Sequence, residues 1–214
     1  MPPLPGPPAA SAPADPPAPN AVAPGAAHVA GLVLAAGAGR RFGGPKALAR
    51  TAAGEPWLVR AVAVLRAAGA APIVVALGAG LPEAAELVPE GVRVVAVADW
   101  AEGMAASLRA GLAALASGDP DAVLVTLVDL PELPVEAGIR LVAGATSPRS
   151  GLRRALWQGA PGHPVLLGAD HLGAVVASVS GDRGAGPYLA AHGVVDVECG
   201  DLGDGSDRDL PLSP

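Results

Sequence analysis

Three basic side chains stand inside a glycine-rich stretch that directly follows an apolar run, and their spacing suits the binding of phosphate. They are Arg40, Arg41 and Lys46, within the segment Leu34-Ala-Ala-Gly-Ala-Gly-Arg-Arg-Phe-Gly-Gly-Pro-Lys46. Glycine lets the backbone approach an anion closely, and successive N–H groups can point at it. The sequence therefore predicts a phosphate-binding loop. A solvated connector between two elements is the alternative that the residues leave open.

Two familiar phosphate loops do not fit this stretch. Gly37, Gly39 and Gly43 give the spacing G-x-G-x-x-x-G, one residue longer than the dinucleotide-binding pattern. Gly39 and Lys46 miss the P-loop spacing by one residue, and no Ser or Thr follows the lysine to hold a metal. The loop therefore belongs to another kind of phosphate site.

A single carboxylate, Asp129, closes the apolar run Val-Leu-Val-Thr-Leu-Val at 123–128. Mg²⁺ prefers hard oxygen ligands, usually one or two carboxylates together with substrate phosphates. We expect Asp129 to face the glycine-rich loop and to bind Mg²⁺. Its alternative role is that of a turn residue before Leu-Pro, a place that Asp favours.

The glycine-rich loop and Asp129 can meet only if the strands that precede them lie in one sheet. Short apolar runs do alternate with helical patterns along the chain. The expected strands are 28–34, 73–77, 92–97, 122–128, 152–158, 164–167 and 194–198. The expected helices are 56–68, 82–88, 104–116, 135–142, 169–179 and 187–192. This alternation of unbroken apolar strands with helices predicts an α/β fold, a Rossmann-like three-layer αβα sandwich with a mostly parallel, mixed sheet. In such sheets ligands bind beyond the carboxyl ends of the strands.

Composition separates a leader from a domain. Ten of the 24 prolines fall within residues 1–28, so we expect a disordered Pro-rich leader over 1–27 and one domain over 28–210.

The single cysteine, Cys199, excludes an internal disulfide and a Cys-rich zinc site. The net charge of −6 argues against nucleic acid as a partner. No segment approaches the roughly 20 apolar residues that span a bilayer, and signal-peptide features are missing, so we expect a cytoplasmic protein without a membrane partner.

The glycine-rich stretch, Leu-Ala-Ala-Gly-x-Gly-x-Arg-Phe-Gly-x-Pro-Lys, resembles the signature loop of nucleotidyltransferases that make nucleoside-diphosphate conjugates. Within that group the chain is most similar to the molybdenum cofactor cytidylyltransferase and related MobA-like NTP transferases. Further matches follow in the family's order: Gly103-Met-Ala-Ala-Ser-Leu-Arg-Ala-Gly111, Leu127-Val-Asp-Leu-Pro131, Gly162-His-Pro-Val165 and Gly181-Asp-Arg-Gly184. The resemblance covers residues 29–210 and implies a fold of the nucleotide-diphospho-sugar transferase type.

The resemblance also implies an activity and the residues that carry it. The implied enzyme is Mg²⁺-dependent and transfers a nucleoside monophosphate from an NTP to a phosphorylated acceptor, molybdopterin, with release of pyrophosphate. Arg41, Lys46 and Asp129 take the catalytic positions. The residues in the nucleotide- and acceptor-binding positions are Leu34, Ala35, Ala36, Gly37, Gly39, Ser107, His163 and Asp182. CTP is the expected nucleotide, because resembling guanylyltransferases carry Leu-Ala-Gly-Gly where this loop reads Leu-Ala-Ala-Gly.

The second metal ligand is the weakest match. The family places it near the C-terminus in an Asp-x-Asp/Gly-Thr-Pro-like turn, and residues 200–209 depart from that pattern. Asp201 matches best as this metal ligand, with Asp204 in reserve.

Other roles remain open for several of these residues. Ser107 fits an exposed helix position, His163 a turn, and Asp182 with Arg183 a solvated turn. Two other functions also remain: transfer to another acceptor, such as phospholactate or a sugar phosphate, and a non-catalytic nucleotide-binding role beside a molybdoenzyme partner. The departure at residues 200–209 favours the non-catalytic role.

Overall fold

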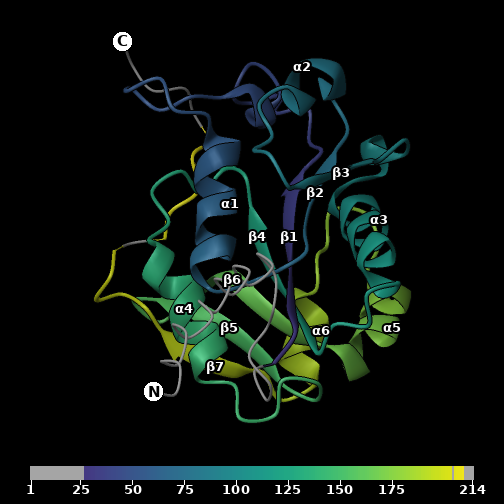
Figure 1. Cartoon of the computed structure of the whole chain (residues 1–214), viewed down its shortest axis with the longest axis vertical. Helices are drawn as coiled ribbons and strands as arrows, with labels where there is room; N and C mark the ends of the chain where they lie inside the picture. The colour runs from purple at the N-terminus through teal and green to yellow at the C-terminus, as the bar shows by residue number, and fades with distance from the viewer. Residues whose placement is uncertain (1–26, 204, 210–214) are drawn as a thin grey trace, which may run out of the picture.

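The computed structural model describes residues 27–203 and 205–209, so the expected leader, apart from Ala27, lies outside the described residues. The chain forms a sheet with the strand order β3-β2-β1-β4-β6-β5-β7 (Figure 1). The strands are β1 (Val29–Ala35), β2 (Ile73–Leu77), β3 (Arg93–Ala96), β4 (Ala122–Leu127), β5 (Leu152–Trp157), β6 (Ala160–Gly168) and β7 (Val195–Glu198). Strand β6 runs antiparallel to both of its neighbours and every other pairing is parallel, which confirms the mostly parallel, mixed sheet.

Helices cover both faces of this sheet. They are α1 (Trp57–Ala67), α2 (Leu81–Ala85), α3 (Met104–Ala116), α4 (Val135–Ala143), α5 (Ala169–Ser178) and α6 (Gly186–Ala191), with the 3-10 turns η1 (Lys46–Leu48) and η2 (Trp100–Glu102). Helices α1 and α4 lie on one face and α3 and α5 on the other (Figure 1). The three-layer αβα arrangement is therefore confirmed. Among the described residues, no helix combines the length and apolar character that crossing a membrane requires.

The core has two halves, one on each side of the sheet. Successive residues of β1 point to opposite faces: Val33 packs with Leu58 and Leu65 of α1, whereas Leu32 packs with Leu108 of α3. Because both faces of β1 are covered by helices, its sequence is an uninterrupted apolar run.

The register of β1 and β4 brings the predicted groups to one edge. Leu34 pairs with Leu127, and the Val128 amide donates a hydrogen bond of 3.1 Å to the Leu34 carbonyl. The glycine-rich loop and Asp129 therefore leave the same edge of the sheet from neighbouring strands.

One segment differs from expectation. Residues 159–162 were expected as a loop, but Trp157 pairs with Ala160, so β5 and β6 form a hairpin with a two-residue turn. Both turn residues have positive φ, 53° at Gln158 and 81° at Gly159. Such turns match the twist of the flanking strands, and β6 consequently begins four residues earlier than the apolar pattern indicates.

Candidate active site

The glycine-rich loop folds back on itself between β1 and η1. The amides of Gly43 and Gly44 donate to the carbonyl of Gly39, at 2.9 and 3.2 Å. Gly39 has φ of +56°, and a Cβ at this position would lie 2.0 Å from the Gly44 oxygen. Only glycine fits there, and the tight turn leads the chain into η1, where Lys46 is the first residue.

Lys46 lies between two carboxylates. Its Nζ is 3.0 Å from Oδ2 of Asp129 and 2.9 Å from Oδ1 of Asp209. Burial disfavours the charged amine, but the hydrogen bonds and charges of Asp209 and Asp129 outweigh it and raise the pKa of Lys46. The hydrogen bond from Lys46, followed by its charge, lowers the pKa of Asp209. Arg41 is exposed and also reaches Asp209, with Nη1 3.2 Å from Oδ2. Lys46 and Asp209 are therefore both charged near neutral pH.

The two carboxylate oxygens of Asp129 differ in their contacts. Its Oδ1 is buried and has no hydrogen-bond partner among the described residues, and a buried polar atom without a partner is costly. Asp129 and Asp209 both lie within hydrogen-bond distance of Lys46 Nζ. Mg²⁺ usually takes one or two carboxylates from a protein when phosphates complete its shell. No group of three or more metal-binding side chains occurs among the residues the structure describes. The two carboxylates are donors of the kind that suits a metal whose other ligands come from a phosphate.

A cavity of about 390 Å³ opens between the glycine-rich loop and the start of α3. This size lies within the range of about 300–1,000 Å³ typical of ligand pockets. The predicted residues that line it are Leu34, Ala36, Gly37, Gly39, Ser107, Asp129 and Asp182. The other lining residues are Arg40, a cation of the predicted phosphate-binding loop, and Ala38, Trp100, Ala101, Gly103, Met104 and Leu127. We call this space the nucleotide cleft.

The start of α3 is held against the segment that carries Asp182. The amide of Ala105 donates to the Gly181 carbonyl at 2.9 Å. Gly103 has φ of +107°, and a Cβ there would lie 2.6 Å from Oδ1 of Asp182. Ser107, one turn further along α3, is 5% exposed. It is therefore buried in the wall of the cleft and does not occupy the exposed helix position that was its alternative.

Two predicted residues lie elsewhere. Ala35 points to the face of the sheet that α1 covers and packs in the core there, because side chains alternate along β1. Asp201 accepts two hydrogen bonds from Arg140 of α4, at 2.6 and 2.8 Å, and the pKa of Asp201 is lowered by these bonds. Asp209, unlike Asp201, therefore lies beside Lys46, while the role of Asp201 as the second metal ligand stays a prediction. Asp204, the reserve residue, lies outside the described residues.

Sequence reasoning missed Asp209, although a signal was present. Asp207-Arg-Asp209-Leu-Pro211 keeps the Asp-x-Asp and the proline of the family turn, with Leu in place of Thr. The Arg208 amide donates to the Asp129 carbonyl at 2.9 Å, and its guanidinium pairs with Glu132 at 2.7 Å. These contacts bring Asp209 back to the edge where Asp129 lies.

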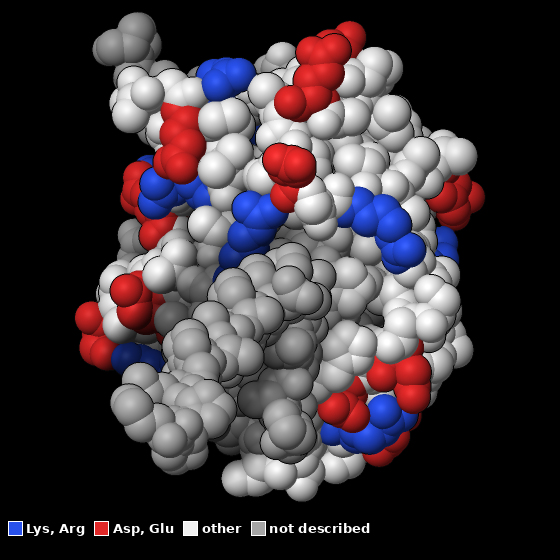
Figure 2. Space-filling model, viewed as in Figure 1, with Lys and Arg blue, Asp and Glu red and all other residues white. Residues whose placement is uncertain are grey.

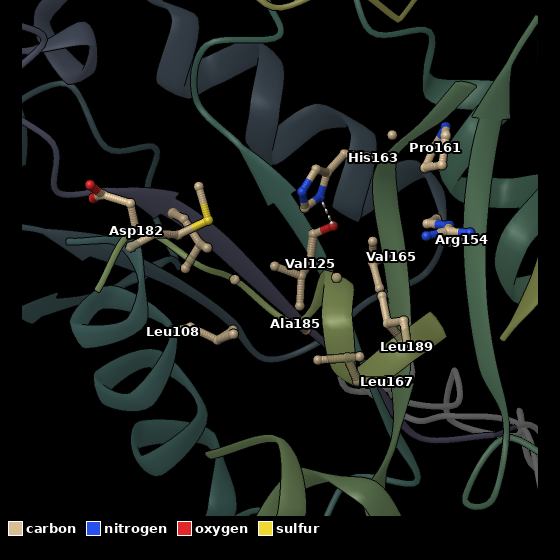
Figure 3. A pocket seen from close by; sticks show the side chains of 15 residues that line it. Leu108, Val125, Arg154, Pro161, His163, Val165, Leu167, Asp182, Ala185 and Leu189 are labelled. Atoms are coloured by element: carbon tan, nitrogen blue, oxygen red, sulfur yellow. Dashed lines mark hydrogen bonds between the residues drawn. The ribbon is translucent and has the colours of Figure 1, made fainter. Parts of the chain in front are cut away.

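A second cavity, of about 270 Å³, adjoins the nucleotide cleft, and Leu34, Met104 and Asp182 line both. Figure 3 shows side chains that line this second cavity. We call it the side cavity. His163 lines it, with Nδ1 3.3 Å from the Val125 carbonyl oxygen. Burial lowers the pKa of His163, against the opposing effects of that carbonyl and of the charge on Asp129. The side cavity thus lies beside the carboxylate edge.

The fold and the cleft together define an α/β protein of the nucleotidyltransferase type, with a glycine-rich loop and a carboxylate pair at the carboxyl edge of the sheet. The chain belongs to the MobA-like NTP transferase family, whose domain model matches residues 31–197.

Individual relatives support this assignment. The chain is 36% identical over 198 residues to the nicotine blue oxidoreductase of Paenarthrobacter nicotinovorans, and the alignment covers 85% of this chain and 92% of that protein. The crystal structure of the Rv0371c protein of Mycobacterium tuberculosis is 26% identical, with a TM-score of 0.69, over 81% of this chain and 89% of that one. A manganese complex of the same Mycobacterium protein aligns at 24% identity with a TM-score of 0.65, over 86% of this chain and 91% of that one.

On the face drawn in Figure 2, basic and acidic side chains are interspersed over the described surface. No broad basic area is visible on this face.

Proposed function

We propose that the protein transfers a nucleoside monophosphate from an NTP to a phosphorylated acceptor, with CTP as the nucleotide and molybdopterin as the acceptor. The observation that carries the proposal is the position of the Lys46 ammonium, within hydrogen-bond distance of both Asp129 and Asp209. At the end of the glycine-rich loop, the cation can bind the phosphates of a triphosphate and the two carboxylates can supply oxygen ligands to its metal.

The reaction needs no covalent enzyme intermediate. An acceptor phosphate oxygen attacks the α-phosphorus, the bond from that phosphorus to the bridging oxygen of the β-phosphate breaks, and pyrophosphate leaves. The protein aligns the two reactants and offsets the developing negative charge. Lys46 and Arg41 hold the triphosphate, and Arg40 adds a cation on the wall of the cleft. Asp129 and Asp209 would hold Mg²⁺, which would act as a Lewis acid and offset the negative charge of the phosphates.

The preference for CTP rests on Ala36. Its methyl group lies in the wall of the nucleotide cleft, at the place where resembling guanylyltransferases carry glycine. An added methyl reduces the room for a base, which favours a pyrimidine over a purine.

The test is pyrophosphate release by the full chain with Mg²⁺, each of the four NTPs, and molybdopterin. We expect release with CTP, at least about 10²-fold slower in Asp129→Ala because charge stabilisation at the phosphates is lost. Binding of CTP without any release would support instead the non-catalytic role beside a molybdoenzyme. Pyrophosphate release with a sugar phosphate or phospholactate, but not with molybdopterin, would show that the acceptor is not molybdopterin.

A second candidate is an oxidoreductase activity. The Paenarthrobacter relative is named for such an activity, and the alignment covers 92% of that relative. Oxidation of a reduced nicotinamide nucleotide by a redox dye, in the absence of NTP, would favour this candidate. Mutation of Asp129 would leave that oxidation largely intact while abolishing nucleotidyl transfer.

A further inference from the structure

The carboxylate of Asp209 occupies the two cations that the proposed function assigns to a triphosphate. Its Oδ1 lies 2.9 Å from Nζ of Lys46, and its Oδ2 lies 3.2 Å from Nη1 of Arg41. Each carboxylate oxygen thus contacts a different cation. Phosphate and carboxylate oxygens are acceptors of the same kind for arginine and lysine donors. A triphosphate and the Asp209 side chain therefore compete for the same two groups.

The backbone that carries Asp209 is anchored, whereas its side chain is not. The Arg208 amide donates to the Asp129 carbonyl at 2.9 Å. Further back, the chain passes so closely over Trp157 that a Cβ at Gly205 would collide with the indole ring. The side chain of Asp209 is 50% exposed. Rotation of this side chain, without movement of the anchored backbone, is therefore enough to release both cations.

The site has no net charge while Asp209 stays in place. Lys46 and Arg41 supply two positive charges, and Asp129 and Asp209 supply two negative ones. A triphosphate without a metal must displace one carboxylate and then remain close to both, and like charges repel. When the triphosphate carries a divalent cation, the displaced carboxylate gains a new partner, since such cations take carboxylate oxygens. Displacement of Asp209 is therefore favourable only for the metal-bound form.

We propose that Asp209 is a specificity-determining residue that excludes metal-free triphosphates from Arg41 and Lys46 and admits those that carry a divalent cation. This inference rests on the proposed function and deepens it, because it names the form in which the nucleotide binds. A residue that only holds the metal has no effect on binding without metal, and one that only supports Lys46 would strengthen it. A competitor weakens metal-free binding, so the sign of the effect separates these roles.

The test is the affinity of inorganic tripolyphosphate for the full chain, measured by calorimetry with EDTA present to remove divalent cations. We expect Asp209→Asn to bind this probe at least about fivefold more tightly than the wild type. The amide keeps the size of the side chain but loses the charge that repels the phosphates. With Mg²⁺ in place of EDTA, Asp209→Asn should bind tripolyphosphate no more tightly than the wild type.

Two further variants serve as controls. Asp209→Glu keeps the charge, so its affinity for metal-free tripolyphosphate should stay within about twofold of the wild type. Asp170→Asn removes one negative charge from an exposed position on α5, outside both cavities, and should leave that affinity unchanged. An affinity that rises as much in either control as in Asp209→Asn would overturn the inference, because the local charge of Asp209 would then not be the cause.

Failure of this inference differs from failure of the proposed function. Suppose the protein releases pyrophosphate from an NTP with Mg²⁺, but Asp209→Asn binds metal-free tripolyphosphate no better than the wild type. That result would overturn the inference alone. Tighter binding by Asp209→Asn, in a protein that releases no pyrophosphate with any NTP and acceptor, would instead overturn the proposed function and leave the competition by Asp209 intact.

Discussion

The carboxylate of Asp209 and the ammonium of Lys46 lie 2.9 Å apart, although 163 residues separate them in the chain. The contact joins the last described segment to the glycine-rich loop, and Asp129, which follows β4, completes it. Lys46 is the only lysine in the sequence. The account of the site therefore depends on these three residues.

Lys46→Met should weaken NTP binding without unfolding the domain. The variant removes the ammonium that we propose to bind the phosphates but keeps a side chain of similar length. We expect the KM for CTP to rise at least about tenfold, since a charge-assisted hydrogen bond is lost. The melting temperature should move by less than about 4 °C, because Asp209 is half exposed and methionine keeps the apolar packing of the lysine side chain. Arg50→Met, outside the cleft, serves as the control; severe unfolding of Lys46→Met would mark the lysine as structural.

Asp209 and Asp201 should differ in their effect on activity. Asp209→Asn removes a carboxylate beside Lys46, whereas Asp201→Asn removes one that is paired with Arg140. We expect transfer by Asp209→Asn to fall at least about tenfold, with a higher requirement for Mg²⁺. Transfer by Asp201→Asn should stay within about twofold of wild type. The reverse order of effects, measured across a Mg²⁺ titration, would favour Asp201 as the metal ligand.

Tryptophan emission should report binding in the nucleotide cleft. Trp57 and Trp157 are 0% and 5% exposed, whereas Trp100 lines the cleft. Addition of CTP with Mg²⁺ should therefore change the emission, and Trp100→Phe should remove most of that change. Trp157→Phe is the control and should keep it. A full change that persists in Trp100→Phe would place the nucleotide elsewhere.

The contact between Asp209 and Lys46 should also be visible in stability against pH. The pKa of Asp209 is lowered from 3.8, so its contribution is fully present above that value and is lost as pH falls through the lower folded value. The pKa of Lys46 is raised from 10.5, so its contribution is lost only as pH rises through the higher folded value. The difference in melting temperature between wild type and Asp209→Asn should therefore be constant from pH 3.8 to pH 10.5. A difference in melting temperature that already declines near neutral pH would contradict an ion pair between Asp209 and Lys46.

Local patterns were sufficient for the strands and for the edge where the site forms. An apolar run that is buried on both faces is visible in the sequence, as at 123–128, and parallel neighbours bring their carboxyl ends together. For this reason the meeting of Lys46 and Asp129 could be anticipated from the amino-acid sequence alone.

Other features depend on contacts that no local pattern contains. Several aspartates lie near the C-terminus, and Asp209 lies beside Lys46 because Arg140 of α4 holds Asp201 and the Arg208 amide binds the backbone of Asp129. The turn at Gln158 and Gly159 was missed because Gln rarely adopts positive φ.

The most direct test of the central claim is calorimetric titration of CTP onto wild type and Asp129→Asn, each with and without Mg²⁺. We predict that Mg²⁺ strengthens CTP binding to the wild type at least about tenfold, since two carboxylates and the phosphates share the cation. The same addition should have little effect on Asp129→Asn. Equal strengthening in both proteins, or binding of CTP that ignores Mg²⁺ in the wild type, would contradict the account.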